Sequence, residues 1–520
     1  MPAAVQGRLR GTVVAKTKGI SWVRCGAAQC TTVQVPLDYA KPAAGTVDLT
    51  VSRRPADNPK GRIGLLFTNP GGPGGPAAYT VGTFAQVLGR DARARFDIIG
   101  VNPRGTGDDQ PALCEGKPGQ KVPDDPGWVF PTNAAQVTAQ LAIDAFNRGL
   151  CKNSKPAILS HMSSGDSARD IDAVRAALGE RRINYYGISY GSHLGATYSQ
   201  LFPRRVRTMV VDGTLDSVAW TTGRGDAART PMTARLGSQL GAQDALMSAI
   251  GECERLGPRY CAEHKTIRAD WAQLRKLKTA PIKLADDFYI TYDVIVALTL
   301  GGLYDPEGVP DVLTMIHMFA TMAKEGSTPA KQSVTQARLA YQVVQHRDEV
   351  NRRTRLGYNP PAAAEEEEPP ATPMYFASFT GVVCDDGVGP ADPQAWVRSA
   401  AIADRKAPGF GSLWTWSSSI CAGWPFHSTG VYRGSFTKRA AGGLLIMNST
   451  HDPATPYSGA LKMRLLRPDS RIVTVPGWGH SVQDTSGCAS RVRRDYLISG
   501  ALPKRDRTCA HDHALFTRLN

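Results

Sequence analysis

The sequence predicts an α/β fold, in which a doubly wound, mostly parallel sheet is interrupted by a helical insertion. Short continuous runs of apolar and β-branched residues, each followed by a glycine-rich or polar turn, are typical of strands buried on both faces. Amphipathic stretches between some of these runs supply the helices that such a sheet requires. The expected strands are Ile63–Thr68, Phe96–Val101, Ile183–Ile188, Thr208–Val211, Gly443–Met447 and Arg471–Val475.

Helical spacing of apolar residues identifies two helices in the first part of the chain, Ala135–Arg148 and Ser164–Leu178. Asp166 and Ser167, near the start of the second, are residue types that cap helix N-termini. Between about residues 222 and 430 the pattern changes, because helical signals dominate and strand signals are few. The helices expected there are Thr233–Leu256, Thr266–Leu277, Val309–Ala323 and Ser333–Val350.

We therefore expect one sheet in two pieces, residues 25–221 and 431–520, with a helical cap inserted at 222–430. The insertion contains a proline-bounded stretch, Pro360–Pro373, with four consecutive glutamates at Glu365–Glu368. Adjacent like charges repel each other and cannot pack, so we interpret this stretch as an exposed loop. An acidic binding strip is the alternative.

Length and composition are those of a globular protein of 520 residues, with 42% hydrophobic and 21% charged residues. This balance excludes wholesale disorder, and no apolar run approaches the roughly 20 residues of a membrane span. The net charge of +15 suggests nucleic acid as a partner. However, the basic residues are dispersed, and no basic run is interleaved with aromatic residues that could stack on bases. We interpret the charge as a solvated surface and expect no nucleic-acid partner.

The ten cysteines form five short-range pairs when they are taken in order along the chain. No CxxC motif and no cysteine–histidine cluster with zinc spacing occurs, so neither a metal site nor a thioredoxin-like site is expected. The pattern suits local disulfides in an oxidising compartment, against the alternative of ten free thiols in a cytosolic enzyme. The spacing leaves the connectivity open. The N-terminus lacks the apolar segment of a signal peptide, so either the protein is cytoplasmic or a signal was removed before this numbering begins.

The clearest chemical signal is the G-x-S-x-G motif formed by Gly187, Ser189 and Gly191. It follows the strand-like run Ile183–Ile188 and precedes the helix-compatible segment His193–Leu201, which is the strand–turn–helix context of a nucleophile elbow. The small residues allow a sharp turn that exposes the serine hydroxyl, and the helix N-terminus stabilises negative charge. We expect Ser189 to be a nucleophile rather than a structural serine.

A serine nucleophile needs a base, and the base needs an orienting acid; in hydrolases with this elbow, both follow the serine along the chain. Asp452 follows one buried-strand run, and His480 follows the next. Both loops are expected at the carboxyl edge of the sheet, where Ser189 also lies. We therefore expect His480 to take the serine proton and Asp452 to orient the imidazole. His451 and His427 are the competing histidines.

Donors for an oxyanion are expected in the loop Thr68–Pro76, which contains the sequence NPGGPGG after the first strand-like run. The candidates are the backbone N–H groups of Gly71 and Gly72, together with that of Tyr190 directly after the nucleophile. A simple Pro/Gly turn or a phosphate-binding loop is the alternative. No GxxxxGK[ST] motif follows and no acidic residue completes a dinucleotide site, so we expect no nucleotide and no other cofactor.

In combination, these motifs resemble α/β-hydrolase peptidases of the prolyl aminopeptidase and tripeptidyl aminopeptidase type. The chain is most similar to secreted actinobacterial tripeptidyl aminopeptidases with their TAP-like C-terminal domain. The resemblance covers most of the chain from about Cys25 onward, and the insertion matches least. The matching segments are Asn69–Gly75, Pro103–Gly107, Asp170–Leu178, Ile183–Gly195, Phe202–Asp216, Cys421–Pro425, Asp452–Pro456 and Gly477–His480.

The resemblance implies an exported serine exopeptidase that removes short peptides, such as tripeptides, from free N-termini beneath a helical cap. It also places the nucleophile, the acid and the base on Ser189, Asp452 and His480. An esterase or amidase acting on lipids or natural products, a prolyl aminopeptidase, and a non-enzymatic binding protein on the same fold are the alternatives. The disulfides that the resemblance implies are Cys25–Cys30, Cys114–Cys151, Cys253–Cys261, Cys384–Cys421 and Cys488–Cys509.

Three features depart from the family pattern and bear on the choice of substrate. Asn102 stands where relatives usually have Asp, Pro76 stands where a small residue is common, and the acidic stretch is unusual. An aminopeptidase must also bind the ammonium group of its substrate, normally with carboxylates. Asp385 and Asp386 in the insertion are candidates, and an ordinary acidic turn is the simpler interpretation of them.

Overall fold

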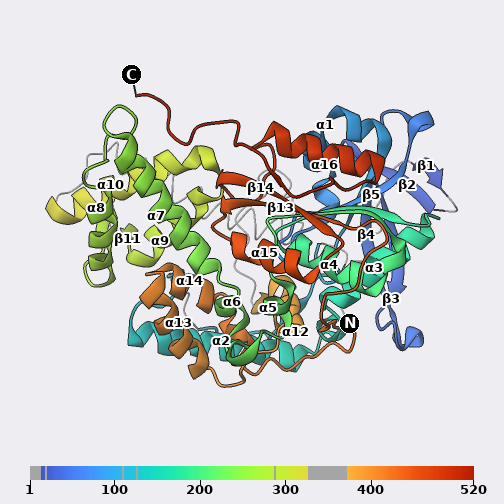
Figure 1. Ribbon diagram of the computed structural model, residues 1–520. Helices are drawn as coiled ribbons and strands as arrows, with labels where there is room; N and C mark the ends of the chain where they lie inside the picture. The colour runs from blue at the N-terminus through green and yellow to red at the C-terminus, as the bar shows by residue number, and fades with distance from the viewer. Residues whose placement is uncertain are drawn as a thin grey trace.

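The computed structural model describes residues 13–17, 20–107, 110–123, 127–285, 288–325 and 372–519. Its central sheet consists of β1 (Val13–Thr17), β2 (Ile20–Cys25), β3 (Ala28–Pro36), β4 (Thr46–Arg54), β5 (Gly64–Asn69), β6 (Phe96–Val101), β8 (Ile183–Ile188), β9 (Val206–Asp212), β13 (Leu444–His451), β14 (Ser470–Trp478) and β15 (Arg507–Thr508). The order across the sheet is β1-β2-β3-β4-β6-β5-β8-β9-β13-β14-β15 (Figure 1). The first four pairs in this order are antiparallel and the following six are parallel.

All six strands expected from the sequence are present, and together with the short β15 they form the parallel part of the sheet. Every residue of β5, β6 and β8 is buried, which explains their continuous apolar runs. The four antiparallel strands at the N-terminal edge were not expected. In β3, for example, buried and exposed residues alternate toward its end, so no continuous apolar run marks this strand in the sequence.

Two layers of helices cover the sheet, and the strands contribute alternate residues to a core on each face. Leu66 and Ile98 pack in one core, whereas Leu65 and Ile99 pack in the other. The first core is covered by α1 (Val81–Arg95) and α16 (Gly487–Ser499), and the second by α3 (Ser164–Ala177), α4 (Tyr190–Leu201) and α15 (Tyr457–Leu466), as Figure 1 shows.

The middle of the chain is mainly helical, and most of it packs around a core of its own that includes the buried residues Ile250, Leu313 and Trp396. The C-terminal segment also reaches this core, because Phe516 is buried in it and the N–H of Leu519 donates to a cap carbonyl (Figure 1). The elements of this region are α6 (Met232–Arg235), α7 (Ser238–Leu256), α8 (Ile267–Gln273), β10 (Ile282–Ala285), β11 (Phe288–Ile290), α9 (Tyr292–Leu303), α10 (Val309–Glu325), α12 (Ser378–Asp386), α13 (Gln394–Lys406) and α14 (Phe410–Trp416).

One helix of the insertion, α12, belongs to the core of the sheet instead, because Val382 and Val383 pack there. The boundaries of the cap at 222 and 430 stay a prediction. The predicted helix Ser333–Val350 and the glutamates Glu365–Glu368 lie outside the described residues. The remaining elements outside the insertion are α2 (Ala134–Ser154), α5 (Ser217–Thr221) and β7 (Leu113–Glu115), which pairs with β12 (Met374–Phe376) of the insertion.

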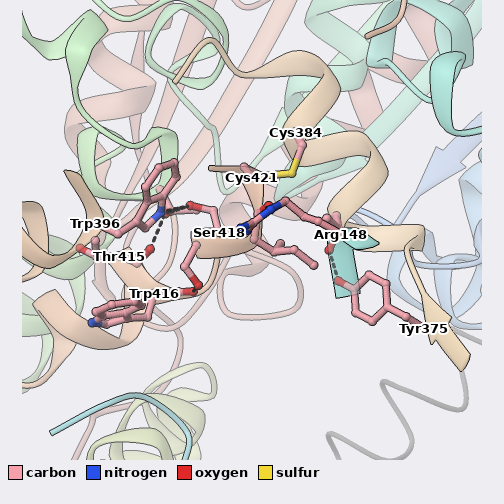
Figure 2. The surroundings of a disulfide bond; sticks show 12 residues. Arg148, Tyr375, Cys384, Trp396, Thr415, Trp416, Ser418 and Cys421 are labelled. Atoms are coloured by element: carbon pink, nitrogen blue, oxygen red, sulfur yellow. Dashed lines mark hydrogen bonds between the residues drawn. A yellow bond between two sulfur atoms is a disulfide. The ribbon is translucent and has the colours of Figure 1, made fainter. Parts of the chain in front are cut away.

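The structure contains the five disulfides that the family resemblance implies, and all ten cysteines are among the described residues. Figure 2 shows the Cys384–Cys421 bond and its surroundings, in which the indole Nε1 of Trp396 donates to the hydroxyl of Ser418 over 3.2 Å. The Cys384–Cys421 disulfide anchors α12 one residue before Asp385. Among the helices described here, none is long and apolar enough to cross a membrane.

Candidate active site

Ser189 lies at the tip of a sharp turn between β8 and α4, with φ 58° and ψ −125°. A residue with a side chain is strained at such a positive φ, and the surrounding structure must hold it there. The N–H of Ser189 donates to the carbonyl oxygen of Asp212 at the end of β9 (2.9 Å). Glycine is required nearby, because a Cβ on Gly187 would lie only 2.3 Å from the carbonyl oxygen of Gly191. The turn therefore carries the serine to the carboxyl edge of the sheet.

Asp452 and His480 follow the neighbouring parallel strands β13 and β14, so their loops lie at the same edge. Nδ1 of His480 is 2.9 Å from Oδ1 of Asp452 and 3.1 Å from Oδ2. The Asp452 carboxylate is buried and accepts further hydrogen bonds from the N–H groups of Ala454, Thr455 and Ser481. These bonds fix the carboxylate against the imidazole.

The Thr455 side chain completes the surroundings of this carboxylate. Its hydroxyl donates to Oδ2 of Asp452 (2.8 Å) and lies 3.2 Å from Nδ1 of His480. Burial alone would raise the pKa of Asp452, but the charge of His480 and the hydrogen bonds outweigh it and lower this pKa below its usual value. An ionised carboxylate in this position keeps a proton on Nδ1 of the imidazole and stabilises the charged imidazolium.

Gly213 links the serine turn with the histidine. It directly follows Asp212, whose carbonyl holds the N–H of Ser189, and it has a φ of +56°. A Cβ on Gly213 would lie 3.3 Å from Cε1 of His480 and 3.0 Å from the Thr455 hydroxyl. Because no side chain is present, the imidazole lies against the end of the strand that also supports the serine turn. The structure thus brings the serine, the histidine and the aspartate to one edge.

This chain is similar to known proteins over most of its length. Carboxylesterase B of Mycobacterium tuberculosis is 30% identical over 502 residues, which cover 93% of this chain and 86% of the relative. Residues 64–231 match the family model of the alpha/beta hydrolase fold, and residues 407–509 match the model of TAP-like proteins. This chain belongs to the α/β-hydrolase family.

Two further relatives of this α/β-hydrolase are named as peptidases. Tripeptidyl aminopeptidase of Streptomyces coelicolor is 29% identical over 523 residues, covering 96% of this chain and 88% of the relative. The serine protease Hip1 of Mycobacterium tuberculosis is 26% identical over 533 residues, covering 97% of this chain and 94% of the relative. The predictions of an α/β-hydrolase fold and of a serine hydrolase are confirmed.

In this α/β-hydrolase, the glycine loop after β5 lies directly against the serine turn. Gly71 has a φ of +94°, and a Cβ there would lie 2.8 Å from Cβ of Ser189 and 3.1 Å from the backbone nitrogen of Tyr190. Only glycine allows this approach. The N–H of Gly71 itself donates to Oδ1 of Asn69 (3.0 Å). The oxyanion-binding role of Gly71, Gly72 and Tyr190 stays a prediction.

Asp385 and Asp386 lie at the end of α12, and both are buried in this hydrolase. Asp386 accepts hydrogen bonds from the N–H (2.8 Å) and hydroxyl (2.5 Å) of Ser164 and from Nε1 of Trp220 (2.8 Å). Asp385 accepts the N–H of Met162 (3.2 Å). Burial raises the pKa of Asp386 to about 6. Both carboxylates attach α12 to the core, and their role in binding a substrate ammonium group stays a prediction.

The competing histidines have other surroundings in the hydrolase. Nδ1 of His451 lies 2.7 Å from Oδ2 of Asp244, and His427 is exposed beside a cavity that Cys384 also lines. A third histidine, His193 in α4, is fully buried, and burial lowers its pKa to about 3, so its ring is neutral. Among the histidines in the described part of the chain, His480 is the one whose imidazole contacts the Asp452 carboxylate.

Sequence reasoning missed two residues of this site. Thr455 is three residues after Asp452 in the segment DPATP, so its closeness along the chain was a usable signal. Tyr304 comes from the cap, and its ring centroid lies 4.9 Å from that of the His480 imidazole. No local pattern connects Tyr304 with a histidine so far along the chain.

Proposed function

We propose that this serine hydrolase is an exported exopeptidase that releases tripeptides from free N-termini through an acyl-enzyme. The observation that carries the proposal is the hydrogen-bonded pair of His480 and buried Asp452 beside the strained turn of Ser189. A base held in this way converts a weak hydroxyl nucleophile into a reactive one. The choice of peptides as substrates is supported by the relatives named tripeptidyl aminopeptidase.

In the proposed reaction, Oγ of Ser189 attacks the carbonyl carbon of the scissile bond while Nε2 of His480 takes the hydroxyl proton. Asp452 stays ionised, holds the proton on Nδ1 and stabilises the imidazolium. His480 then gives its proton to the leaving nitrogen, the C–N bond breaks, and the N-terminal peptide remains as an ester on Ser189. His480 next deprotonates a water molecule that attacks this ester. His480 returns this proton to Oγ of Ser189 as the ester C–O bond breaks, so the serine hydroxyl is restored and the peptide leaves as a carboxylic acid that ionises in water.

The charge that develops on the substrate oxygen needs donors at the same place. The backbone N–H of Tyr190 and the N–H groups of the glycine loop around Gly72 are the proposed donors, supported by the close approach of Gly71 to the serine turn. The start of α4 adds the positive end of a helix dipole at this point.

Export is supported by the five disulfides, because such bonds persist in oxidising compartments and are rare in the cytosol. If the protein is exported, it accumulates outside the cytosol of the cell that makes it, and intact-mass measurement of that material shows all five bonds formed. Protein that stays in the cytosol with free thiols would contradict export.

A second candidate is a carboxylesterase that uses the same residues, and the relative named carboxylesterase B favours it. Ser189 and His480 would act in the same order, with an alcohol as the leaving group in place of an amine. The two candidates therefore differ in what is bound next to the reacting carbonyl and share the catalytic step.

The experiment that tests the proposal is a panel of chromogenic peptides of one to four residues, with free or acetylated N-termini. We expect cleavage of free tripeptide substrates and its loss on acetylation. Release of single proline residues would instead indicate a prolyl aminopeptidase. Rapid hydrolysis of p-nitrophenyl esters without peptide cleavage would establish the esterase.

The nucleophile is tested separately by Ser189→Ala, which we expect to lower kcat by roughly 10⁴–10⁶-fold because no other group replaces the hydroxyl. The control is Ser499→Ala, which removes an exposed hydroxyl on α16 that donates to a backbone carbonyl. It should keep the activity of the unaltered enzyme. Near-normal turnover by Ser189→Ala would contradict the assignment.

A further inference from the structure

The loop that carries His480 is held from two sides, and one of them is the cap. On the core side, the N–H of Ser481 donates to Oδ2 of Asp452 over 3.0 Å. On the other side, the N–H of His480 itself donates to the carbonyl oxygen of Tyr304 over 2.9 Å. Tyr304 directly follows helix α9 of the insertion. The backbone of the proposed base is therefore bonded to the cap as well as to the sheet.

The Tyr304 side chain contacts the same histidine a second time. Its ring centroid lies 4.9 Å from that of the His480 imidazole, and the two ring planes meet at 63°. Edge-to-face contacts of this kind are favourable only over a limited range of ring orientations. The backbone bond and the ring contact together restrict both the height of the imidazole above the sheet and the plane in which it lies.

The cap also approaches the residue before the histidine. Gly479 has a φ of +99°, and a Cβ there would lie 2.7 Å from Cδ of Pro306, two residues after Tyr304. On the other side of the histidine, Ser481 has a positive φ of 75°, which a residue with a side chain adopts only where its surroundings hold it. The loop thus has an unfavourable backbone conformation that outside contacts must maintain.

Packing does not supply those contacts everywhere around the loop. A cavity of about 620 Å³ is lined by Pro306 of the cap and by Gly477 and Trp478, which lead into the histidine loop. Pro306 packs against Gly479, but Gly477 and Trp478 border open space on this side, so packing around the start of the loop is incomplete. The hydrogen bond and the ring of Tyr304 are therefore important for its position.

We propose that Tyr304 is a positioning residue for the reaction, which sets the place and the plane of the His480 imidazole from the cap. This inference rests on the assignment of His480 as the base in the proposed function. It makes the cap part of the proton-transfer machinery, because the base is in position only while α9 and the segment after it are closed on the sheet. Displacement of the cap would release the imidazole from its alignment with Ser189.

The test uses a small fluorophosphonate, which reacts with the activated serine and does not require recognition of a peptide. We expect Tyr304→Ala to slow the labelling of Ser189 roughly 10- to 100-fold, because displacing a catalytic base by about 1 Å lowers the reaction rate by factors of this order. With a cleavable substrate, kcat should fall by the same factor while KM stays nearly constant. Both variants keep the backbone carbonyl that accepts the N–H of His480, so Tyr304→Ala tests the ring. Tyr304→Phe keeps the ring as well, and it should restore most of the labelling rate.

The matched control is Trp414→Ala, which removes a larger, partly buried ring from the same cap core. It should lower the unfolding temperature at least as much as Tyr304→Ala while keeping the labelling rate. Equal loss of rate in both variants would show that cap stability, and not positioning, is responsible, and would overturn the inference. So would an unchanged labelling rate in folded Tyr304→Ala.

A spectroscopic readout separates alignment from folding. The proton between Nδ1 of His480 and Asp452 should give a sharp low-field resonance in the unaltered enzyme, and this resonance should broaden in Tyr304→Ala but not in Trp414→Ala. If labelling falls as expected in Tyr304→Ala but no peptide is cleaved by the unaltered enzyme, the inference stands and the peptidase function fails. If the unaltered enzyme is not labelled at Ser189, both fail.

Discussion

Two fully buried aspartates, Asp452 in the loop after β13 and Asp386 at the end of α12, have pKa values that are shifted in opposite directions. Asp452 and Asp386 are each about 1% exposed, and each accepts several hydrogen bonds from backbone and side-chain donors. Yet the pKa of Asp452 is lowered below its usual value, while burial raises the pKa of Asp386 to about 6. The difference lies in the charge that faces them.

Asp452 faces the imidazole of His480, whose positive charge favours the ionised carboxylate. Asp386 faces the hydroxyl of Ser164 and the indole of Trp220, which are neutral donors, and the neutral buried ring of His193 lies 3.9 Å away. Hydrogen bonds from neutral donors do not fully replace the water that burial removes. A charged partner therefore keeps one aspartate ionised, as its proposed catalytic role requires, whereas the hydrogen bonds of the other attach a helix.

The largest expected effect is on catalysis. Asp452→Asn should lower kcat by roughly 10³–10⁴-fold, because the neutral amide favours the wrong imidazole tautomer and no longer stabilises the imidazolium. Asp386→Asn, measured in the same assay, should change kcat by less than about tenfold, because it touches no reacting group. Equal losses in the two variants would contradict the division of roles between these aspartates.

The next effect is on stability and concerns the disulfide beside Asp385. Cys384→Ser with Cys421→Ser opens a bridge between residues 37 apart, which should lower the free energy of unfolding by about 3–4 kcal/mol. Cys114→Ser with Cys151→Ser is a matched control, because that bridge also joins residues 37 apart. Chemical denaturation should show similar losses for both pairs. A much larger loss for one of them would mean that the bond does more than limit the unfolded chain.

A third effect depends on pH. An aspartate has a pKa of about 3.9 in an unfolded chain, whereas burial raises the pKa of Asp386 to about 6 in the fold. The folded protein therefore holds this proton more tightly, so the stability linked to it is present below about pH 4 and is lost as the pH rises to about 6. Relative to Asp386→Asn, the unaltered protein should lose about 3 kcal/mol of unfolding free energy across this window.

This pH dependence also separates the two disulfides. Opening Cys384–Cys421 loosens the end of α12 and admits water to Asp386, so the difference between pH 4 and pH 6 should shrink in that variant. Opening Cys114–Cys151 should leave it intact. The measurement is denaturant unfolding at several pH values. A constant difference between the unaltered protein and Asp386→Asn over this range would show that Asp386 is not the group that titrates.

The smallest effect is expected at Thr455. Thr455→Val keeps the shape of the side chain but removes the hydroxyl that donates to Asp452, and it should lower kcat about tenfold, in the range of one hydrogen bond to a charged group. Thr221→Val is the control, since the hydroxyl of Thr221 is also buried but donates to a helix carbonyl. The measurement is the steady-state kcat of both variants at one pH. Equal kcat values for Thr455→Val and Thr221→Val would show that the Thr455 hydroxyl does not contribute to catalysis.

The parallel part of the fold was predictable because burial on both faces leaves a local mark, a continuous apolar run, as in β8. The antiparallel edge was not, because strands with one exposed face, such as β3, resemble many polar segments. Ser189, Asp452 and His480 could be singled out for the same reason as the buried strands. Each lies within two residues of the end of a recognisable strand, and the order of strands in the sheet then decides which of them meet.

The partners of Asp386 and the contact of Tyr304 were beyond prediction for a different reason. Ser164 and Trp220, which donate to Asp386, are far from it along the chain, and the sequence around them has no feature that indicates this contact. The bond between Tyr304 and His480 likewise depends on how the cap rests on the sheet. Such contacts follow from the packing of whole elements, which a single sequence does not reveal.

The attachment of the C-terminal segment to the cap has a consequence for how the protein is made. Phe516 fills part of the cap core, and the N–H of Leu519 donates to the carbonyl of Arg259. The cap helices that these residues pack against are synthesised much earlier. A ribosome therefore produces the serine turn and the cap helices well before the cap core can be completed. The nascent chain carries an unfinished cap until residue 516 has emerged, so the cap core closes only after the loops of Asp452 and His480 have been synthesised.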